Sequence, residues 1–292
     1  MTVDLSAAAD FLAGSARLLD QRRFDLLFGD GTPDAVLAAV EGYRNPDGGY
    51  GWGLEPDLRS RTSQPGGALH AFEAIADVAP VRTARSAELS DWLASVTLPD
   101  GGLPFALPVP DPAACAPFWV GAEQTSSLQI TAVVAAAAHR VAAADPAVAG
   151  HPWLGRATAY CLDAVRALGP DPHAMVLAFA AQLLDAAASP QAAELVEHLR
   201  PSVPPDGLLH VAGGADDEFM RPLDFAPFPG GPARTLFDPA VVEAELDRLA
   251  AAQQPDGGWT VDFGSYSPAA TLEWRGQRTV AALVVLRANG RI

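Results

Sequence analysis

The sequence predicts an all-α protein in which amphipathic outer helices alternate with apolar inner helices. Three observations lead to this prediction. The turn sequence Pro-Asp-Gly-Gly occurs at 46–49, 99–102 and 255–258, with a reduced copy, Pro-Asp-Gly, at 205–207. Hydrophobic residues make up 49% of the 292 residues, which is enough to fill a large core. No segment shows strand-like alternation of useful length.

The repeated turns set the length of one structural unit. Their aspartates, at positions 47, 100, 206 and 256, are separated by 53, 106 and 50 residues, so one unit is near 50 residues. Such a unit holds two helices of ordinary length and their turns. Because Pro fixes φ, Asp bonds its own backbone and Gly accepts positive φ, each copy is predicted to be a corner between two helices.

The last unit shows both kinds of helix. Pro239 follows the N-cap residue Asp238, and Val242 and Leu246 then recur on one face, as in an amphipathic outer helix. After the corner, residues 279–286 are almost entirely apolar, as in an inner helix that is buried on every side.

The same pattern is predicted along the chain. Helices are expected near 4–29, 32–43, 67–78, 84–97, 124–144, 151–168, 172–187 and 190–200, besides the final pair. The segment 207–237 is too rich in Pro and Gly for a helix, and a structureless segment of this length is usually functional. We therefore predict a single domain over 1–292 with an irregular, lid-like insertion at 207–237.

Composition excludes several classes of function. The formal net charge is −16 and every basic residue is an arginine, so the surface repels phosphate backbones and no nucleic-acid partner is expected. Cys115 and Cys161 form no CxxC, which argues against a disulfide framework and a zinc ribbon. The first residues lack a basic signal region, and no apolar run reaches about 18 residues, so we expect a cytoplasmic protein without a transmembrane segment.

Two motifs carry a family resemblance. Residues 253–259, Gln-Gln-Pro-Asp-Gly-Gly-Trp, match the QW motif Q-x-x-D-G-x-W of squalene and oxidosqualene cyclases. Residues 47–53, Asp-Gly-Gly-Tyr-Gly-Trp-Gly, are similar to the repeat of protein prenyltransferase β subunits. From about 32 to 290 the chain thus resembles the terpenoid cyclase and protein prenyltransferase superfamily. The resemblance implies an α/α toroid (barrel) of five to six inner and outer helix pairs around a central cavity.

The resemblance also separates structural residues from catalytic ones. In those cyclases the Gln and Trp of such motifs tie helices together, so Gln253 and Trp259 are expected to be structural, with Trp259 buried. The D-x-D-D acid of class II cyclases is absent, the D-D-x-x-D magnesium motif is broken because 216–220 ends in Met, and neither cysteine belongs to a D-x-C zinc motif. We therefore expect no metal and no cofactor.

The first acidic candidates lie between a corner and an inner helix. Glu55 and Asp57 could act as general acid or base, and Arg59 could clamp an anion. The alternative is that these residues cap the next helix and pair among themselves.

The second acidic candidates lie in the insertion. Crowded carboxylates raise one another's pKa, and a neutral carboxyl in an apolar cavity suits alkene protonation, so Asp216, Asp217 and Asp224 are candidate acids. We predict that 207–237 closes one mouth of the toroid and delivers at least one of them to the cavity. The alternative is that they are exposed loop acids.

Aromatic side chains could line the cavity, because their faces stabilise carbocations, pack isoprenoid chains and stack on sugars. The candidates are Tyr50, Trp52, Phe105, Phe118, Trp119, Phe225 and Phe228. Packing in the core would explain them equally well. His70, on an inner helix, is a further candidate for the binding site, although a histidine in this position is more often part of the core.

Three functions remain open. The leading hypothesis is an isoprenoid-handling enzyme, terpene cyclase-like or prenyltransferase-like, with a small apolar ligand and acid-initiated chemistry; self-association is left open. A polar cavity with two facing carboxylates would favour a carbohydrate-active toroid enzyme, a glycosidase or lyase. An apolar cavity without an inward acid would favour a non-catalytic module that binds a small molecule or a protein. The deciding observation is which of these acids point inward: Glu55, Asp57, Asp216, Asp217, Asp224 and Glu273.

Overall fold

The computed structural model describes residues 3–187 and 189–292, and this part of the chain is mostly helical. Its thirteen α-helices are α1 (Leu5–Ser15), α2 (Leu18–Phe28), α3 (Pro33–Glu41), α4 (Pro65–Asp77), α5 (Ala84–Val96), α6 (Leu128–Ala142), α7 (Pro146–Ala149), α8 (Pro152–Arg166), α9 (Ala174–Ala186), α10 (Ala192–Leu199), α11 (Pro222–Phe225), α12 (Pro239–Ala251) and α13 (Pro268–Ala288). Two short 3₁₀ helices, η1 (Arg200–Ser202) and η2 (Pro232–Leu236), and two strands, β1 (Leu209–His210) and β2 (Phe219–Met220), complete the elements. The predicted all-α class is confirmed.

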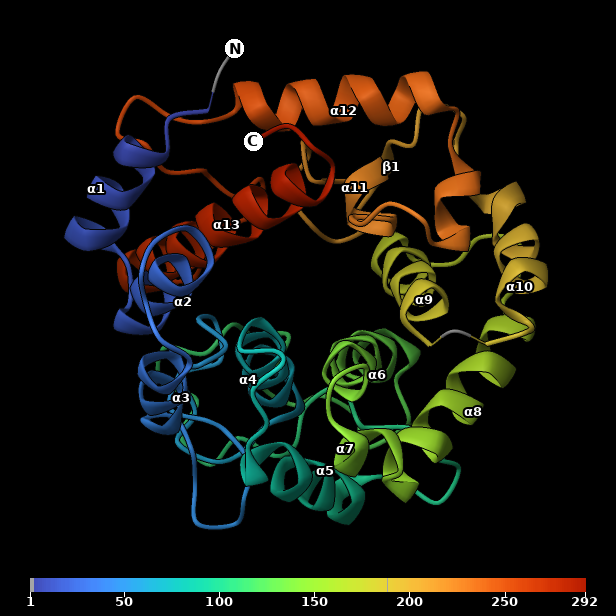
Figure 1. Cartoon of the computed structure of the whole chain (residues 1–292). Coiled ribbons are helices and arrows are strands. Elements are labelled where there is room, and N and C mark those ends of the chain that lie inside the picture. Colours follow the sequence, from blue (N-terminus) through green and yellow to red (C-terminus); the bar gives the residue numbers. More distant parts are fainter. Residues whose placement is uncertain (1–2, 188) are drawn as a thin grey trace.

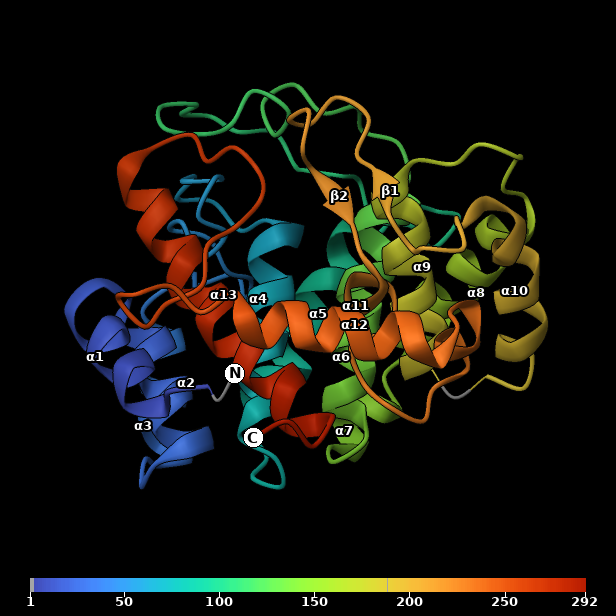
Figure 2. The same ribbon diagram turned by 90° about the horizontal axis from the view of Figure 1, so that it is seen from above.

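The helices lie in two concentric ranks around a central axis (Figure 1). The inner rank contains α2, α4, α6, α9, α11 and α13, and the outer rank contains α1, α3, α5, α8, α10 and α12. In the side view, the long loop 97–127 and the β1–β2 hairpin lie at the end of the ring where the inner helices begin, and the C-terminus lies toward the other end (Figure 2). The two ends therefore differ in what covers them.

The repeated corners share one backbone geometry. In each Pro-Asp-Gly-Gly copy, the aspartate Oδ1 accepts a hydrogen bond of 3.0 to 3.1 Å from the N–H of the second glycine. The first glycine has a φ between 93° and 99°, which side chains other than glycine rarely adopt. In the reduced copy, Asp206 accepts from Leu208 N at 3.1 Å. The turn chemistry predicted for these corners is confirmed.

The last corner also joins the two ends of the chain. Trp259 is 1% exposed and its Nε1 donates to the carbonyl of Leu249 at 2.8 Å. Gln253 bonds the backbone of Asp4 twice, accepting from its N–H and donating to its carbonyl, both at 2.8 Å. The structural roles predicted for Trp259 and Gln253 are confirmed.

The structure differs from the predicted elements near the N-terminus and in the insertion. Residues 4–29 form two helices, because the backbone at Ala16 and Arg17 is extended and turns the chain from the outer rank to the inner one. The insertion 207–237 contains the antiparallel β1–β2 pair, which the sequence did not predict because each strand has two residues. The single-turn α11 then takes the place of an inner helix. No described helix has the length and apolarity needed to cross a membrane.

Candidate functional site

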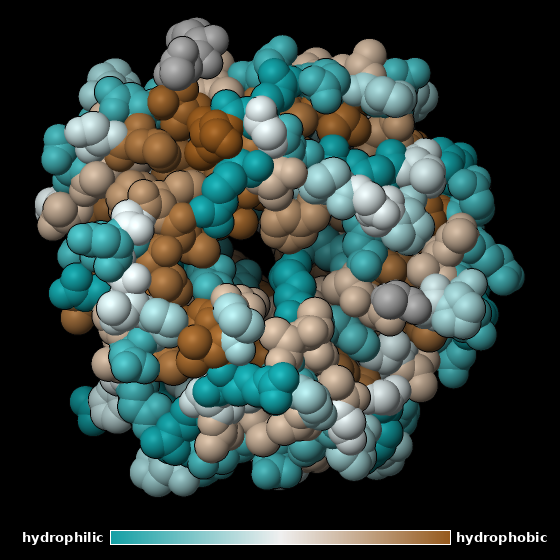
Figure 3. All heavy atoms as spheres, in the orientation of Figure 1, coloured by the Kyte–Doolittle hydropathy of each residue, from teal (hydrophilic) through white to brown (hydrophobic). Residues whose placement is uncertain are grey.

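Charged side chains occupy the inner wall of the ring. The space-filling view along the axis, from the end opposite the hairpin, shows a hollow at the centre with hydrophilic and hydrophobic residues around it (Figure 3). On this wall Arg23 of α2 pairs with Asp77 of α4 at 2.6 Å, and both side chains are largely buried. The interior of the ring is therefore more polar than an isoprenoid cavity was expected to be.

A histidine lies between two glutamates on this wall. His70 Nε2 is 2.8 Å from Glu55 Oε2, and His70 Nδ1 is 2.8 Å from Glu73 Oε2. Glu55 comes from the loop after the first corner, whereas Glu73 lies one turn beyond His70 on α4, where positions i and i+3 share a face. The His70 and Glu55 side chains are 6% and 7% exposed. We call Glu55, His70 and Glu73 the acid–imidazole triad.

His70 and Glu73 are charged at neutral pH. Burial alone would lower the pKa of His70, but the charges and hydrogen bonds of Glu73 and Glu55 outweigh it and raise that pKa to about 9. Burial would likewise raise the pKa of Glu73, but His70, Arg23 and Arg140 lower it to about 2. His70 is thus an imidazolium ion held between two acceptors, and it is a poor proton donor to an alkene.

Aromatic rings border the triad. Trp274 of α13 approaches His70 edge-on, with ring centroids 5.7 Å apart. A side chain added at Gly66 would meet both Glu55 Cγ, at 3.4 Å, and Trp119 Cη2, at 3.5 Å, so the Trp119 ring reaches the same place. The structure therefore brings together His70, Glu55 and Trp119, all of which the sequence marked as site residues.

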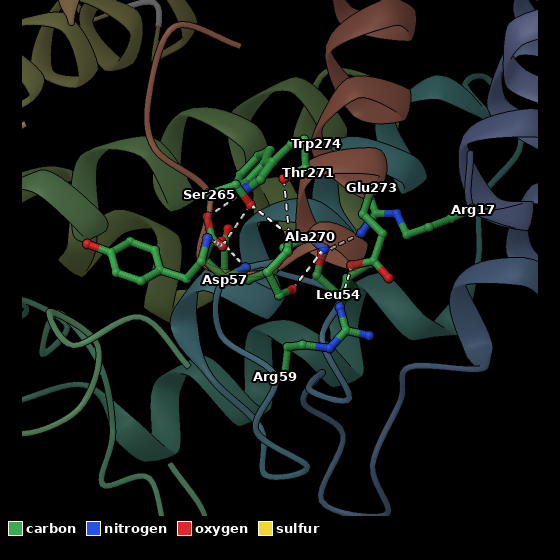
Figure 4. A network of polar contacts seen from close by, with 12 residues as sticks. Arg17, Leu54, Asp57, Arg59, Ser265, Ala270, Thr271, Glu273 and Trp274 are labelled. Carbon is green, nitrogen blue, oxygen red and sulfur yellow. Dashed lines mark hydrogen bonds and ion pairs between the residues drawn. The ribbon is translucent and has the colours of Figure 1, made fainter. Parts of the chain in front are cut away.

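Asp57 fixes the position of Trp274 (Figure 4). Its Oδ2 accepts from Trp274 Nε1 at 2.7 Å, and its Oδ1 accepts from Tyr266 N at 2.9 Å and from Ser265 Oγ at 3.3 Å. Asp57 is 4% exposed. Because both of its oxygens are occupied, its geometry supports positioning of the loop 260–267 and of Trp274 rather than proton transfer.

Arg59 and Glu273 form an ion pair beside this network, with Nη1 2.6 Å from Oε2 (Figure 4). Arg17 donates to the carbonyl of Leu54 at 2.8 Å and pairs with Asp20. Arg59 is thus engaged with a carboxylate of α13, and it pairs with neither Glu55 nor Asp57.

The three candidate acids of the insertion separate. Asp216 and Asp217 are exposed in the loop between β1 and β2, so they lack the apolar surroundings expected of a proton donor. The neighbouring Glu218 is buried instead, and its Oε2 accepts a hydrogen bond from the N–H of Ala215 within that loop.

Asp224, on α11, has a different environment. Its Oδ2 accepts from the N–H of Arg221 at 2.8 Å, and its Oδ1 lies 3.8 Å from Arg278 of α13. Burial raises the pKa of Asp224, against the opposing effects of Arg278 and of the hydrogen bond from Arg221. The pKa of Asp224 is therefore shifted in the direction that a proton donor needs.

Three predicted aromatic residues lie away from the triad. Tyr50 and Phe225 are fully buried in the hydrophobic core between helices, where neither can contact a ligand. Trp52 is 50% exposed, and its Nε1 donates to Asn45 Oδ1 at 2.8 Å. These assignments need correction, because the first corner buries Tyr50 and turns Trp52 outward, and Phe225 on α11 packs against Phe237. Phe105 stacks on Trp119, with ring centroids 4.5 Å apart, and so supports the site indirectly.

Glu73 and Trp274 were not predicted from the sequence as site residues. Glu73 could have been found from its i+3 spacing to His70 on a predicted inner helix. Trp274 had no such signal, because the predicted inner helix began only at 279, whereas α13 begins at Pro268. Among the described residues, no group of three or more His, Cys, Asp and Glu side chains could hold a metal ion. Independence from metal stays a prediction.

Comparisons with known proteins bear on the fold. No protein-family model and no curated protein matches the sequence. A solved structure of a protein from Actinoplanes is similar with a TM-score of 0.60 at 15% identity, covering 98% of each chain. A variant of the type II terpene cyclase MstE from Scytonema, in complex with its substrate geranylgeranyl dihydroxybenzoate, is similar with a TM-score of 0.55 at 15% identity, covering 99% of this chain and 97% of the cyclase. The chain therefore has a terpene cyclase-like fold along nearly its whole length.

Proposed function

We propose that the protein is an enzyme with an α/α toroid fold that cyclises or isomerises a substrate carrying an isoprenoid chain inside the ring. The similarity to a terpene cyclase over nearly the whole chain supports this proposal, as does the shape of a ring that is hollow at its centre. The expected partner is a prenylated small molecule whose chain lies along the aromatic rings and whose polar part meets the charged wall.

The roles that we assign to the site residues rest on two contacts made by α13. Along α13, Trp274 contacts the triad through His70, and Arg278, one turn further on, contacts Asp224. Trp274 and Arg278 are about one helical turn, roughly 5 Å, apart along α13, so this helix contacts both the proposed proton donor and the proposed cation-stabilising surface.

Each group then has a distinct task. Asp224, whose pKa is raised by burial, donates the proton that starts the reaction. The faces of Trp274 and Trp119 stabilise the positive charge that develops on the chain. The carboxylate of Glu73, whose pKa is lowered to about 2, also favours a cationic intermediate.

The test uses compounds that carry a geranylgeranyl chain, including geranylgeranyl dihydroxybenzoate. Cyclisation keeps the mass, so liquid chromatography with mass spectrometry should show an isomer with a new retention time. Asp224→Asn should abolish this product and leave the melting temperature nearly unchanged. Asp216→Asn and Asp217→Asn are matched controls, because they make the same chemical change at exposed sites. Failure of the wild-type protein to convert any of these compounds, or full activity of Asp224→Asn, would refute the proposal.

The polar wall favours one alternative. Glu55 and Glu73 are two carboxylates on the inner wall, as a carbohydrate-active toroid enzyme would need. Each of them bonds His70, and their charged state suits a base or nucleophile better than an acid. Release of reducing ends from oligosaccharides by the wild-type protein, lost in Glu73→Gln, would favour this alternative.

A further inference from the structure

A cavity lies near the ends of two inner helices, at the opposite end of the ring from the hairpin. It has a volume of about 180 Å³ and lies between Arg140 of α6, Gln182 and Asp185 of α9, and the segment 227–231. Because one water takes about 30 Å³ in the liquid, this space admits a ligand group larger than a single water.

Arg140 is an unpartnered cation on the wall of this cavity. Of the protein's nineteen arginines, only Arg140 and Arg61 have a guanidinium group that forms neither an ion pair nor a hydrogen bond with residues 3–187 and 189–292. Arg61 is exposed to solvent and stacks over Trp52, with its Cζ 5.6 Å from the ring centroid. Arg140 is instead half-buried at the end of α6, beside the cavity, where its guanidinium has no partner of opposite charge.

Arg140 is partly buried, and its surroundings shift its pKa. Burial lowers its pKa, against the opposing effect of the carboxylates Glu73 and Asp77, while Arg23 lowers it further. Those two carboxylates are already bonded to His70 and Arg23, respectively. The guanidinium therefore keeps its donors available for a group that enters the cavity.

The rest of the lining suits an anion with a flat or apolar neighbour. The Phe228 ring is 5.9 Å from Arg140 Cζ. Asp185 is the carboxyl on the lining, and burial raises its pKa, against the effects of the hydrogen bond from Ala233 N and of Arg234. Asp185 Oδ1 is already occupied by the hydrogen bond from Ala233 N, at 2.7 Å.

We propose that Arg140 binds the oxyanion of a small ligand, a carboxylate or a phosphate, in this cavity at the open end of the ring. Its planar fork can donate two parallel hydrogen bonds to either group. A bound oxyanion supplies the hydrogen-bond acceptor that the Arg140 guanidinium lacks in the fold. The site does not depend on the chemistry proposed above, because no catalytic group takes part in it. If both hold, the oxyanion marks the head group of the substrate.

Isothermal titration calorimetry with two probes, inorganic phosphate and benzoate, tests this site on the whole protein without any turnover. At least one probe should bind the wild-type protein saturably, and Arg140→Gln should weaken that binding by at least about tenfold. Arg61→Gln is the matched control, because it removes the other unpartnered arginine, and it should bind like the wild type. Binding of benzoate alone indicates a carboxylate ligand, and binding of phosphate alone indicates a phosphate ligand.

A second variant distinguishes a loss of binding from a loss of folding. Arg140→Lys keeps the charge but loses the planar fork, so it should bind with an affinity between those of the wild type and Arg140→Gln. Circular dichroism checks that each variant is folded. The proposal is overturned if neither probe saturates the wild-type protein, or if the folded Arg140 variants bind as tightly as the wild type.

Discussion

At the residue scale, two histidines on inner helices show how local surroundings set protonation. His70 lies between two carboxylates, and its pKa is raised from its ordinary value of 6.5 to about 9. His139, whose Nε2 is 2.8 Å from Thr158 Oγ1, has no carboxylate partner among the described residues, and burial lowers its pKa to about 4. The two residues should therefore respond to pH in opposite directions.

The first prediction concerns stability as a function of pH. Because folding raises the pKa of His70, its contribution is fully present below pH 6.5 and is lost as the pH rises through about 9. The stabilisation of the wild type over His70→Gln should thus shrink by up to about 3 kcal/mol over that range. Below pH 4.5 the contribution from Glu73 also begins to fall, and it is lost as the pH passes about 2. Urea unfolding at a series of pH values measures the difference.

His139→Gln is the control for this prediction. Folding lowers the pKa of His139, so its neutral form stabilises the protein above pH 6.5, and that contribution is lost as the pH falls through about 4. NMR titration should give the same two pKa values directly. A His70 pKa near 6.5 would show that the triad is not charged in the way described.

Site residues could be predicted from the sequence where the signal is local. Glu55, Asp57 and His70 were found because they lie next to a corner or on a predicted inner helix. The interpretation of Asp216 and Asp217 failed, because acid content alone does not tell a buried loop from an exposed hairpin. The role of Asp57 could not be predicted either, since its partners are more than 200 positions away in the sequence.

At the element scale, the corners were predictable and the helix ends were not. Proline, aspartate and glycine specify a turn over four residues, so each corner is fixed by its own sequence. The length of α13 instead depends on contacts with other segments. Its N-cap residue Ser267 follows the loop that Asp57 holds.

The second prediction tests that link between elements. Asp57→Ala would leave Trp274 Nε1 and Tyr266 N without their acceptor, and the loss of two such part-buried hydrogen bonds costs about 2 to 4 kcal/mol. Asp216→Ala, at an exposed site, should change stability by less than about 0.5 kcal/mol. Denaturant unfolding compares the two variants. Equal stability of Asp57→Ala and the wild type would contradict the anchoring role.

The third prediction concerns the packing under the last corner. Trp259 is buried and bonded to Leu249, so Trp259→Ala should cost about 3 to 5 kcal/mol through the cavity that it leaves. Trp52→Ala, at a half-exposed ring, should cost much less. Loss of activity in Trp259→Ala without loss of stability would show instead that the ring takes part in the reaction.

At the scale of the whole molecule, the first and last helical pairs close the ring. The bonds between Gln253 and Asp4 join positions 249 residues apart. This contact lies beyond any local signal, and the sequence suggested it only through the resemblance to proteins in which such a glutamine ties helices together.

The fourth prediction tests ring closure at one atom. Gly257 has a φ of 93°, and a side chain there would lie 2.0 Å from the carbonyl oxygen of Ala7 in α1. Gly257→Ala must therefore both strain its own backbone and push α1 away from the last corner, which we expect to cost about 3 kcal/mol or more. Gly264→Ala is the matched control, because that site has no atom within 4 Å and no positive φ. Thermal unfolding should show a large loss for the first variant and almost none for the second. In hydrogen exchange, Gly257→Ala should lose protection first in α1, at the seam between the two ends of the chain. Equal melting temperatures for the two variants would mean that the ring does not depend on this contact.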